Sequence, residues 1–474
     1  MKSQKGGFDH FTKTYHSLLE LDQNHKIPTR TDLNIASSVL SHFPNKKQAI
    51  SKVAFIDSST NQTITYYELH QSVGSLASAL YKELRIQKGD VVLILSQNTL
   101  LYPIMCLAVL STGAILTTSD PLKTKQEISK QPELVERLNS TGLPVVLTRC
   151  STNFSAEELI EHHEPLVFSH AQIAQTDVAA ILFTSGTTGQ SKGVCLTHGN
   201  FVSSITLLKW SLKEASDRDD VFLCMLPMFH VYVFVFFVLG LPCIEVKTVL
   251  MEKYELEAMV DAVQIHKVTY LPSTPSVIVE MVKSTSFNRL KLSSLKRVLS
   301  GGGKLKSCGA ATCLCSDDEA KAHSGSSGML VPGVSARVVG VETGEALQPC
   351  RKGEIWLKSS IGCDGWLRTG DLCYFDEDGF VAPAELEAIL LAHPQILDAA
   401  VIPVEDEAGQ VPVAYLVRAV NSELTEDQVI LFIANPNVEK VNFVNAIPRS
   451  ATVKTLRNEL LLLSKHNFVL KSCL

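Results

Sequence analysis

No apolar run in the sequence is long enough to cross a lipid bilayer. The longest run, residues 231–244, is interrupted by Gly240 and Pro242, whereas a membrane-spanning helix needs about 20 consecutive apolar residues. The first residues, MKSQKGGFDHFTKTYHS, lack the apolar segment of a secretory signal. We therefore expect neither a transmembrane segment nor a secretory leader, and we interpret residues 231–244 as a buried core segment.

Basic charge is scarce and is not clustered. The 43 lysines and arginines are outnumbered by 49 aspartates and glutamates, which gives a net charge of −6. This balance argues against binding of nucleic acid or another polyanion. The 12 cysteines are scattered without a disulfide framework, as expected for reduced thiols in a cytosol-like compartment. Four residues do not have the spacing of a usual zinc site, namely Cys308, Cys313, Cys315 and His323.

The last three residues bear on location. Ser472-Cys473-Leu474 resembles the peroxisomal address Ser-Lys-Leu, with a cysteine where the basic residue should be. An untargeted tail is the alternative. Both a cytoplasmic and a peroxisomal location therefore remain open.

The chain of 474 residues is long enough for two or three domains. Between residues 53 and 300, predicted strands alternate with helices, the rhythm of an α/β domain. The strands are predicted at residues 53–56, 91–95, 114–117, 178–184, 221–225, 268–271 and 296–299. The helices are predicted after a Thr65–Glu68 capping box, near 100–112 and near 255–265.

After residue 303 the alternation of strands and helices ends, and the predicted secondary structure changes twice more along the chain. Residues 304–330 are small, polar and glycine-rich, and we predict an irregular segment. Residues 334–341 and 353–357 are predicted strands of a β-rich subdomain. Beyond Gly379 we predict a small α+β unit, with a helix over Pro383–Leu391. The fold class is thus α/β, with layered sheets and a β-rich subdomain over residues 1–380 and an α+β unit over 381–474.

A loop rich in hydroxyls and glycines follows the predicted strand at 178–184. It reads TSGTTGQSKG over residues 184–193. Glycines let a backbone present N–H groups to an anion, hydroxyls donate to phosphate oxygens, and Lys192 adds a positive charge. The loop does not match the Walker A pattern. A flexible turn is the alternative, but the combination favours a phosphate-binding loop at the end of a strand, where ligands of α/β sheets bind.

This loop resembles the signature of adenylate-forming acyl-CoA ligases, and among them the plant 4-coumarate–CoA ligase-like proteins. Further matches are Leu226-Pro-Met-Phe-His230, Ser300-Gly-Gly302, Gly353-Glu-Ile-Trp356, Trp366-Leu-Arg-Thr-Gly-Asp371, residues 381–387 and residues 447–454. The resemblance implies a large N-terminal domain and a small C-terminal lid that rotates between two half-reactions. In these, ATP and a carboxylic acid form an acyl-adenylate, and coenzyme A then forms a thioester and releases AMP.

The resemblance also implies roles for individual residues. The β- and γ-phosphates would be held by Thr184, Ser185, Gly186, Thr187, Thr188, Gly189 and Lys192, with Thr188 helping to orient Mg²⁺. His230 would lie beside the acyl carboxylate and ATP, near Gly301 and Gly302 of the substrate site. Asp371, a carboxylate expected after a tight turn, would accept the ribose hydroxyls, and Lys454 would reach the α-phosphate and the carboxylate. The alternatives are a structural histidine, a turn aspartate and a surface lysine.

The sequence departs from the family at three places. Residues 304–330 stand where the family has a Gly-Tyr-Gly-Met-Thr-Glu adenine motif, and the segment between Ile361 and Trp366 is short. Phe380 runs directly into Val381, where the family has its hinge. In addition, Val453 replaces a glycine that precedes the lysine. We therefore hypothesise weak or absent ligase activity.

Three functions remain open. The first is ligation of a hydroxycinnamic or a fatty or oxylipin acid to coenzyme A, and Trp356 favours the ligase-like branch of the family, since true 4-coumarate ligases usually have cysteine there. The second is an inactive protein that binds nucleotide or acyl ligand. The third is adenylation followed by a different second step.

Overall fold

The computed structural model describes most of the chain. The described residues are 7–120, 155–165, 172–184, 192–212, 219–283, 289–300, 312–313, 326–341, 343–359, 365–383, 390–391, 393–406, 409–419, 422–433, 440–448 and 460. Within them, no helix is both long enough and apolar enough to span a membrane. The cysteines described with free thiols are Cys106, Cys195, Cys224, Cys243, Cys350 and Cys373.

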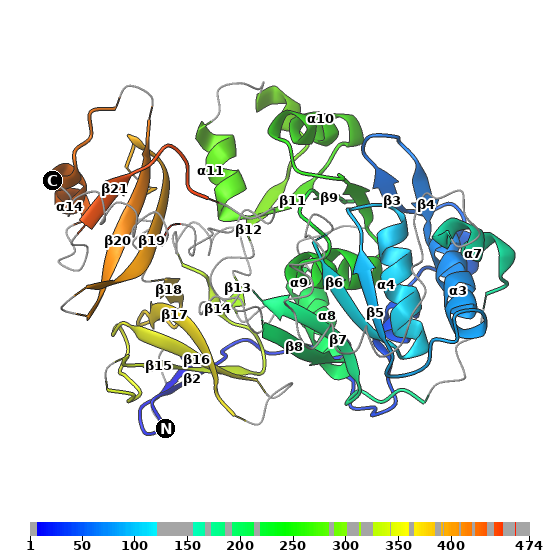
Figure 1. Ribbon diagram of the computed structural model, residues 1–474. Helices are drawn as coiled ribbons and strands as arrows, with labels where there is room; N and C mark the ends of the chain where they lie inside the picture. The colour runs from blue at the N-terminus through cyan, green and yellow to red at the C-terminus, as the bar shows by residue number, and fades with distance from the viewer. Residues whose placement is uncertain are drawn as a thin grey trace.

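Two sheets share one core in the N-terminal half (Figure 1). Sheet 1 has the order β5-β6-β7-β8, with three parallel strands and an antiparallel β8. Its strands are β5 (Val91–Leu95), β6 (Ile115–Ser119), β7 (Val178–Thr184) and β8 (Lys192–Thr197). Sheet 2 has the order β12-β11-β9-β10-β3-β4, and all its strands except the edge strand β4 are parallel. Its strands are β3 (Val53–Asp57), β4 (Thr63–Thr65), β9 (Val221–Cys224), β10 (Lys247–Leu250), β11 (Tyr270–Ser273) and β12 (Arg297–Ser300).

Helices accompany these two sheets, as the alternation of strands and helices predicts. The helices are α1 (Ile35–Leu40), α2 (Lys46–Ala49), α3 (Tyr66–Lys82), α4 (Leu101–Thr112), α7 (Ala156–His162), α8 (His198–Leu212), α9 (Val231–Val233), α10 (Leu256–His266) and α11 (Pro275–Lys283). Shorter turns are η2 (Gln23–His25), the π-helix η3 (Phe234–Gly240), η4 (Leu241–Ile244) and η5 (Arg289–Leu292). Helix α3 begins with the predicted capping box of Thr65 and Glu68. Residues 231–244 are helical and mostly buried, so the interpretation as a core segment is confirmed.

The second half of the chain adds β-rich parts. Sheet 3 is antiparallel, in the order β1-β2-β15-β16-β17-β18, and includes the N-terminal hairpin. Its strands are β1 (Phe8–Asp9), β2 (Thr14–His16), β15 (Val334–Val339), β16 (Gly353–Ser359), β17 (Leu367–Phe375) and β18 (Val381–Pro383). Strands β19 (Ile396–Asp406), β20 (Gly409–Arg418) and β21 (Lys440–Phe443) form sheet 4, which is accompanied by α14 (Glu426–Ile433). The α/β class with a C-terminal α+β unit is confirmed.

Three local predictions differ from the structure. The helix predicted to begin at Pro383 is wrong at its start, because Val381–Pro383 pair with β17. The strand predicted at 268–271 lies at 270–273, since Lys267 ends α10 in a left-handed conformation. The segment 304–330 is not irregular throughout, because β13 (Thr312–Cys313) pairs with β14 (Met329–Leu330). The domain boundary between residues 380 and 381 stays a prediction.

His198 begins α8 and is fully buried. Its Nδ1 accepts the backbone N–H of Ile35 at 3.2 Å, and its backbone N–H donates to the carbonyl of Asp177. The Asp177 carboxylate also pairs with Lys88 at 2.6 Å. Burial lowers the pKa of His198 from its ordinary value of 6.5 to about 4, an effect larger than the opposing one of Asp177. The ring is therefore neutral in the folded protein at neutral pH.

This buried ring predicts acid sensitivity. The unfolded chain binds a proton at His198 near pH 6.5, but the folded chain binds it only near pH 4. Stability should therefore fall as pH drops through this window, by about 2 kcal/mol between pH 7 and pH 5. His198→Asn keeps an acceptor for Ile35 but does not titrate, so its loss over this range should be smaller. Denaturant unfolding at both pH values tests this, and equal losses in the two proteins would contradict it.

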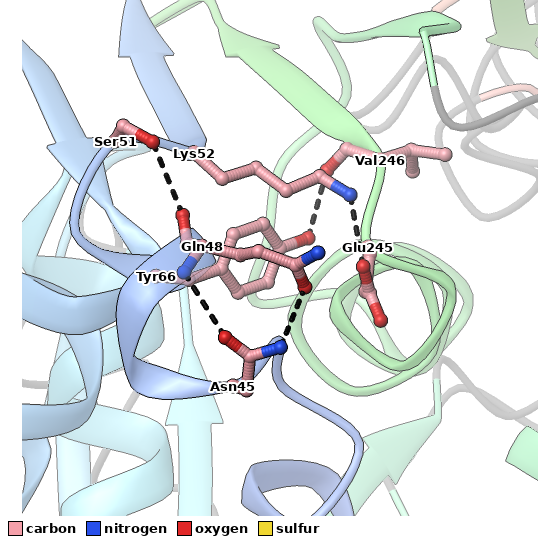
Figure 2. Close-up of polar contacts among 7 residues, drawn as sticks. All are labelled: Asn45, Gln48, Ser51, Lys52, Tyr66, Glu245 and Val246. Atoms are coloured by element: carbon pink, nitrogen blue, oxygen red, sulfur yellow. Dashed lines mark hydrogen bonds and ion pairs between the residues drawn. The ribbon is translucent and has the colours of Figure 1, made fainter.

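Figure 2 shows contacts that join the segment before β3 to the segment between η4 and β10. Lys52 Nζ lies 2.9 Å from the carboxylate of Glu245, and both side chains are mostly buried. The Tyr66 hydroxyl donates to the carbonyl of Val246 at 2.9 Å, and burial raises the pKa of this phenol. Asn45 caps the short helix α2. The end of the helical segment 231–244 is thus attached to the N-terminal part of the core.

Two contributions of Glu245 to stability can be measured separately, namely its ion pair with Lys52 and its left-handed backbone conformation. Its φ of 61° and ψ of 27° lie in the left-handed region, which costs a residue with a Cβ about 1 kcal/mol relative to glycine. Glu245→Ala and Glu245→Gly both remove the ion pair with Lys52, but only glycine relieves the backbone. We therefore expect Glu245→Ala to unfold at a lower temperature than Glu245→Gly. The reverse order in thermal unfolding would show that backbone conformation does not decide the outcome.

Candidate functional site

The backbone of the predicted phosphate loop starts and ends on two paired strands. β7 ends at Thr184, β8 begins at Lys192, and these two residues lie opposite each other in an antiparallel pair. The intervening residues 185–191, and the side chains of Thr184 and Lys192, lie outside the described residues. The base of the loop is therefore a hairpin at the carboxyl end of β7, in contrast to the strand–loop–helix arrangement of a Walker A site.

His230 lies in a turn beyond the carboxyl end of β9. Its backbone N–H donates to the carbonyl of Pro227 at 3.1 Å, which closes the turn. The same residue is the N-cap of α9, since its Nδ1 accepts the backbone N–H of Tyr232 at 3.3 Å. The chain continues as the π-helix η3, a rare conformation that is frequent at functional sites.

The N-cap contact also decides which ring nitrogen of His230 carries a proton. A backbone N–H can donate only to an unprotonated Nδ1, so the neutral ring has its hydrogen on Nε2. Nε2 is then a hydrogen-bond donor on the side of the ring away from the helix cap. Such a donor suits a carboxylate or phosphate oxygen.

Two side chains, Asn98 after β5 and Thr118 on β6, hold the turn that carries His230. Asn98 Nδ2 donates to the carbonyls of Leu226 and Met251, and its Oδ1 accepts the N–H of Met228 at 2.8 Å. Thr118 Oγ1 donates to the carbonyl of Phe229 at 2.8 Å. Neither residue was predicted from the sequence as part of the site. The available signal was a polar residue shortly after β5 and another near the end of β6, because ligand sites of α/β sheets form beyond the carboxyl ends of strands.

The segment that contains Gly301 and Gly302 begins at the same edge of sheet 2. β12 ends at Ser300, which pairs with Ser273 at the end of β11. Since β12, β11 and β9 are neighbours and parallel, their carboxyl ends lie at one edge. Gly301 and Gly302 themselves lie outside the described residues, so their role stays a prediction.

The tight turn predicted before Asp371 is wrong. Residues 369–371 lie within strand β17, opposite a single residue, Ile355, because the pairs on either side are Trp356 with Arg368 and Glu354 with Leu372. This irregularity is a β-bulge, a feature that redirects side chains. The Thr369 hydroxyl donates to the carbonyl of Ile355 at 2.7 Å. The side chain of Asp371 lies outside the described residues.

Trp356, the residue that favours the ligase-like branch of the family, lies on strand β16 of sheet 3. Its Nε1 donates to Glu354 at 2.9 Å, and the guanidinium of Arg368 lies 5.1 Å from its ring centroid. Across the sheet, Arg337 pairs with Trp356 and stacks on Trp366 at 4.5 Å. These contacts stabilise the face of the sheet.

The position where the hinge is expected lies within a β-hairpin. β17 and β18 are joined by Asp376–Phe380, where the Asp376 carboxylate accepts the N–H groups of Asp378 and Phe380. Phe380 and Val381 are buried. Val381 also exchanges backbone hydrogen bonds with residues 327 and 328. This junction is therefore part of sheet 3.

Other predicted site residues lie outside the described part of the chain. Lys454 and the loop residues Ser185, Gly186, Thr187, Thr188 and Gly189 belong to this group. The side chains of the rejected zinc set, Cys308, Cys313, Cys315 and His323, also lie outside the described residues. Within the described ranges, no three His, Cys, Asp or Glu side chains are arranged to bind a metal ion.

Two family models match the chain. One is described as AMP-binding enzyme and matches residues 43–308, and the other is described as AMP-binding enzyme C-terminal domain and matches residues 385–454. The first match ends at the start of the segment that lacks the expected adenine motif.

Several plant proteins are similar over nearly the full chain. "Probable CoA ligase CCL5" of Humulus lupulus is 36% identical and covers 94% of this chain and 94% of its own. "Peroxisomal OPC-8:0-CoA ligase 1" of Arabidopsis thaliana is 34% identical over 88% of this chain and 91% of its own. "4-coumarate--CoA ligase-like 4" of Oryza sativa subsp. japonica is 34% identical over 97% of both. The first alignment runs over 537 positions, more than the 474 residues present here, so the relative has residues without a counterpart in this chain.

Solved structures share the fold. ATP-bound MatB from Rhodopseudomonas palustris has a TM-score of 0.75 at 21% identity, covering 92% of this chain and 99% of its own. MenE from Bacillus subtilis, in complex with ATP and magnesium, has a TM-score of 0.70 at 22% identity, covering 90% and 99%. At these identities the likeness extends to the fold alone.

Proposed function

The chain belongs to the family of AMP-binding enzymes, with plant CoA ligases and 4-coumarate–CoA ligase-like proteins as relatives, and from this premise we propose that it is an ATP-dependent carboxylic acid–CoA ligase. In the first step a carboxylate oxygen attacks the α-phosphorus of ATP, and the bond to the β-phosphate breaks to release pyrophosphate. In the second step the thiol sulfur of coenzyme A attacks the acyl carbon, loses its proton, and AMP leaves.

One observation carries this proposal. The turn with His230 is hydrogen-bonded through Thr118 to β6, and β6 is the neighbour of β7, from which the glycine-rich loop emerges. A carboxylate near His230 and phosphates on the loop would therefore be neighbours. Positioning of this kind supplies much of the rate of phosphoryl-type transfer.

We propose these roles for the residues. The loop Thr184, Ser185, Gly186, Thr187, Thr188, Gly189 and Lys192 binds the β- and γ-phosphates, and Thr188 helps to orient Mg²⁺, whose charge offsets that of the phosphates. The Nε2–H of His230 donates to the carboxylate and thereby orients it. Lys454 stabilises the negative charge that develops at the α-phosphate. Asp371 binds the ribose, and Gly301 and Gly302 line the acyl site.

The acid is a hydroxycinnamic or a fatty or oxylipin acid. A relative named peroxisomal OPC-8:0-CoA ligase supports the second class, and so does Trp356 of the ligase-like branch. The same relative supports a peroxisomal location over a cytoplasmic one.

A second candidate is a protein that binds nucleotide or acyl ligand without turnover. Two observations favour this candidate. The alignment with the Humulus lupulus relative has more positions than this chain has residues, so the relative has segments that this chain lacks. In addition, Phe380 and Val381 are buried at the position where the hinge is expected. Without a hinge, the lid would not reach the orientation that the second step needs.

Acid-dependent exchange of pyrophosphate into ATP separates the two candidates. Purified protein, shown to be folded by its thermal transition, is assayed with Mg²⁺ and a panel of cinnamic and fatty acids. Exchange that depends on one class of acid supports the ligase and identifies its substrate class. Saturable ATP binding without exchange supports the binding protein, and failure to bind ATP contradicts both.

A further inference from the structure

Asn98 connects three segments from two sheets. It follows β5 of sheet 1, and its amide contacts the segments that follow β9 and β10 of sheet 2. The side chain is only 4% exposed. Both hydrogens of its NH₂ group and its carbonyl oxygen have partners at 2.8–2.9 Å. Since an unpaired buried amide is costly, this arrangement fixes the two sheet edges relative to each other.

Thr118 makes a second connection between the sheets, nearer to His230. It lies on β6 and is 5% exposed. The carbonyl that it binds belongs to Phe229, the residue directly before His230. Asn98 therefore fixes the start of the turn, at Leu226 and Met228, and Thr118 fixes its end.

We propose that Asn98 and Thr118 are positioning residues that set the imidazole of His230 relative to the base of the glycine-rich loop. This inference rests on the proposed function, because it concerns the same site. The loop base belongs to sheet 1 and His230 to the segment after β9 of sheet 2. The distance between the carboxylate at His230 and the ATP phosphates on the loop thus depends on contacts between the two sheets. Asn98 and Thr118 supply such contacts at the turn itself.

Adjacent threonines provide a matched pair of variants. Thr118→Val removes the hydroxyl that binds Phe229 and preserves the shape of the side chain. Thr117→Val makes the same chemical change one residue earlier, on the opposite face of β6, at a hydroxyl that is buried without a partner among the described residues. We expect Thr118→Val to lower kcat for pyrophosphate exchange about tenfold with little change in KM for ATP. Thr117→Val should leave both constants unchanged.

Asn98 has a matched control in Asn34. Asn34 is also buried, donates to the carbonyl of Leu110 and caps α1, but it makes none of the contacts to the His230 turn. Asn98→Ala and Asn34→Ala should both lower the unfolding temperature, whereas only Asn98→Ala should lower kcat. Equal loss of kcat in the two variants would overturn the inference. If Asn98→Ala does not fold, the threonine pair decides.

A spectroscopic readout separates this inference from the proposed function. Imidazole ¹⁵N NMR, with the His230 signals assigned by their loss in His230→Asn, should show the Nε2–H form in the wild type and in Thr117→Val. In Thr118→Val the signals should shift toward an average of the two neutral forms, because the contact from Tyr232 to Nδ1 loosens. If the wild-type protein shows no pyrophosphate exchange but the three proteins show these NMR spectra, the proposed function is contradicted and the positioning role of Thr118 is supported. Identical spectra and kinetics for the two threonine variants overturn the inference.

Discussion

Insertion of the adenine segment of a plant relative after Gly303 is expected to lower KM for ATP by about tenfold to 100-fold. An aromatic platform under a base contributes about 1–3 kcal/mol by stacking, and each 1.4 kcal/mol corresponds to about a factor of ten in affinity. The chain has no such motif between Gly303 and Ser326. Acid-dependent pyrophosphate exchange at varied ATP measures this effect, because adenylation precedes any use of coenzyme A.

An insertion of equal length made of glycine and serine is the control for this graft. It restores chain length without a stacking surface, so KM for ATP should not improve. If both insertions lower KM for ATP equally, the missing chain length limits ATP binding and the missing stacking surface does not. If neither insertion lowers KM for ATP, the absence of the adenine segment does not weaken ATP binding.

A graft of the hinge between Phe380 and Val381 should act on the other half-reaction. In the present chain these residues are buried in the hairpin of β17 and β18, so a rotation at this point would break the sheet. A restored hinge would allow the lid to reorient, a conformational step that often limits turnover. Thioester formation from preformed acyl-adenylate should therefore rise, while pyrophosphate exchange stays the same.

Local patterns predicted much of the fold. The capping box at Thr65 and Glu68, the continuous apolar run at Val91–Leu95 and the turn residues between strands each act over a few neighbours, so the sequence displays them directly. The strand that leads into the phosphate loop was predicted for the same reason, because its apolar run directly precedes the glycine-rich stretch. Its antiparallel partner β8 was not predicted.

Other features depend on partners distant in sequence. Pro383 begins a predicted helix, yet Val381–Pro383 add to sheet 3 because β17 offers an unpaired edge. The bulge at Thr369–Asp371 exists only relative to Ile355 on the neighbouring strand. Asn98 and Thr118 gain their roles from carbonyls more than 100 residues away. Such contacts have no local signature, so only the folded structure identifies them.

Loss of the donor on His230 should have the largest effect of any single substitution described. His230→Asn keeps an acceptor near the position of Nδ1, and thus the cap to Tyr232, but lacks a donor at the position of Nε2. We expect kcat for pyrophosphate exchange to fall about 100-fold, the loss that follows removal of one preorganised donor at a site of developing charge. The unfolding temperature should change little, because the cap remains.

Two further variants show which atom of His230 matters. The longer amide of His230→Gln does not fit the cap as an imidazole does, but it can place a donor near the position of Nε2. This variant should therefore recover part of the activity while it destabilises the turn. His230→Ala loses both the cap and the donor, and should combine the low kcat of the asparagine variant with a cap loss of about 1 kcal/mol. Activity would then depend on Nε2 of His230, and the stability of the turn would depend on Nδ1. If His230→Asn instead exchanges pyrophosphate at the wild-type rate, the histidine is a structural cap, and the carboxylate is oriented by other residues.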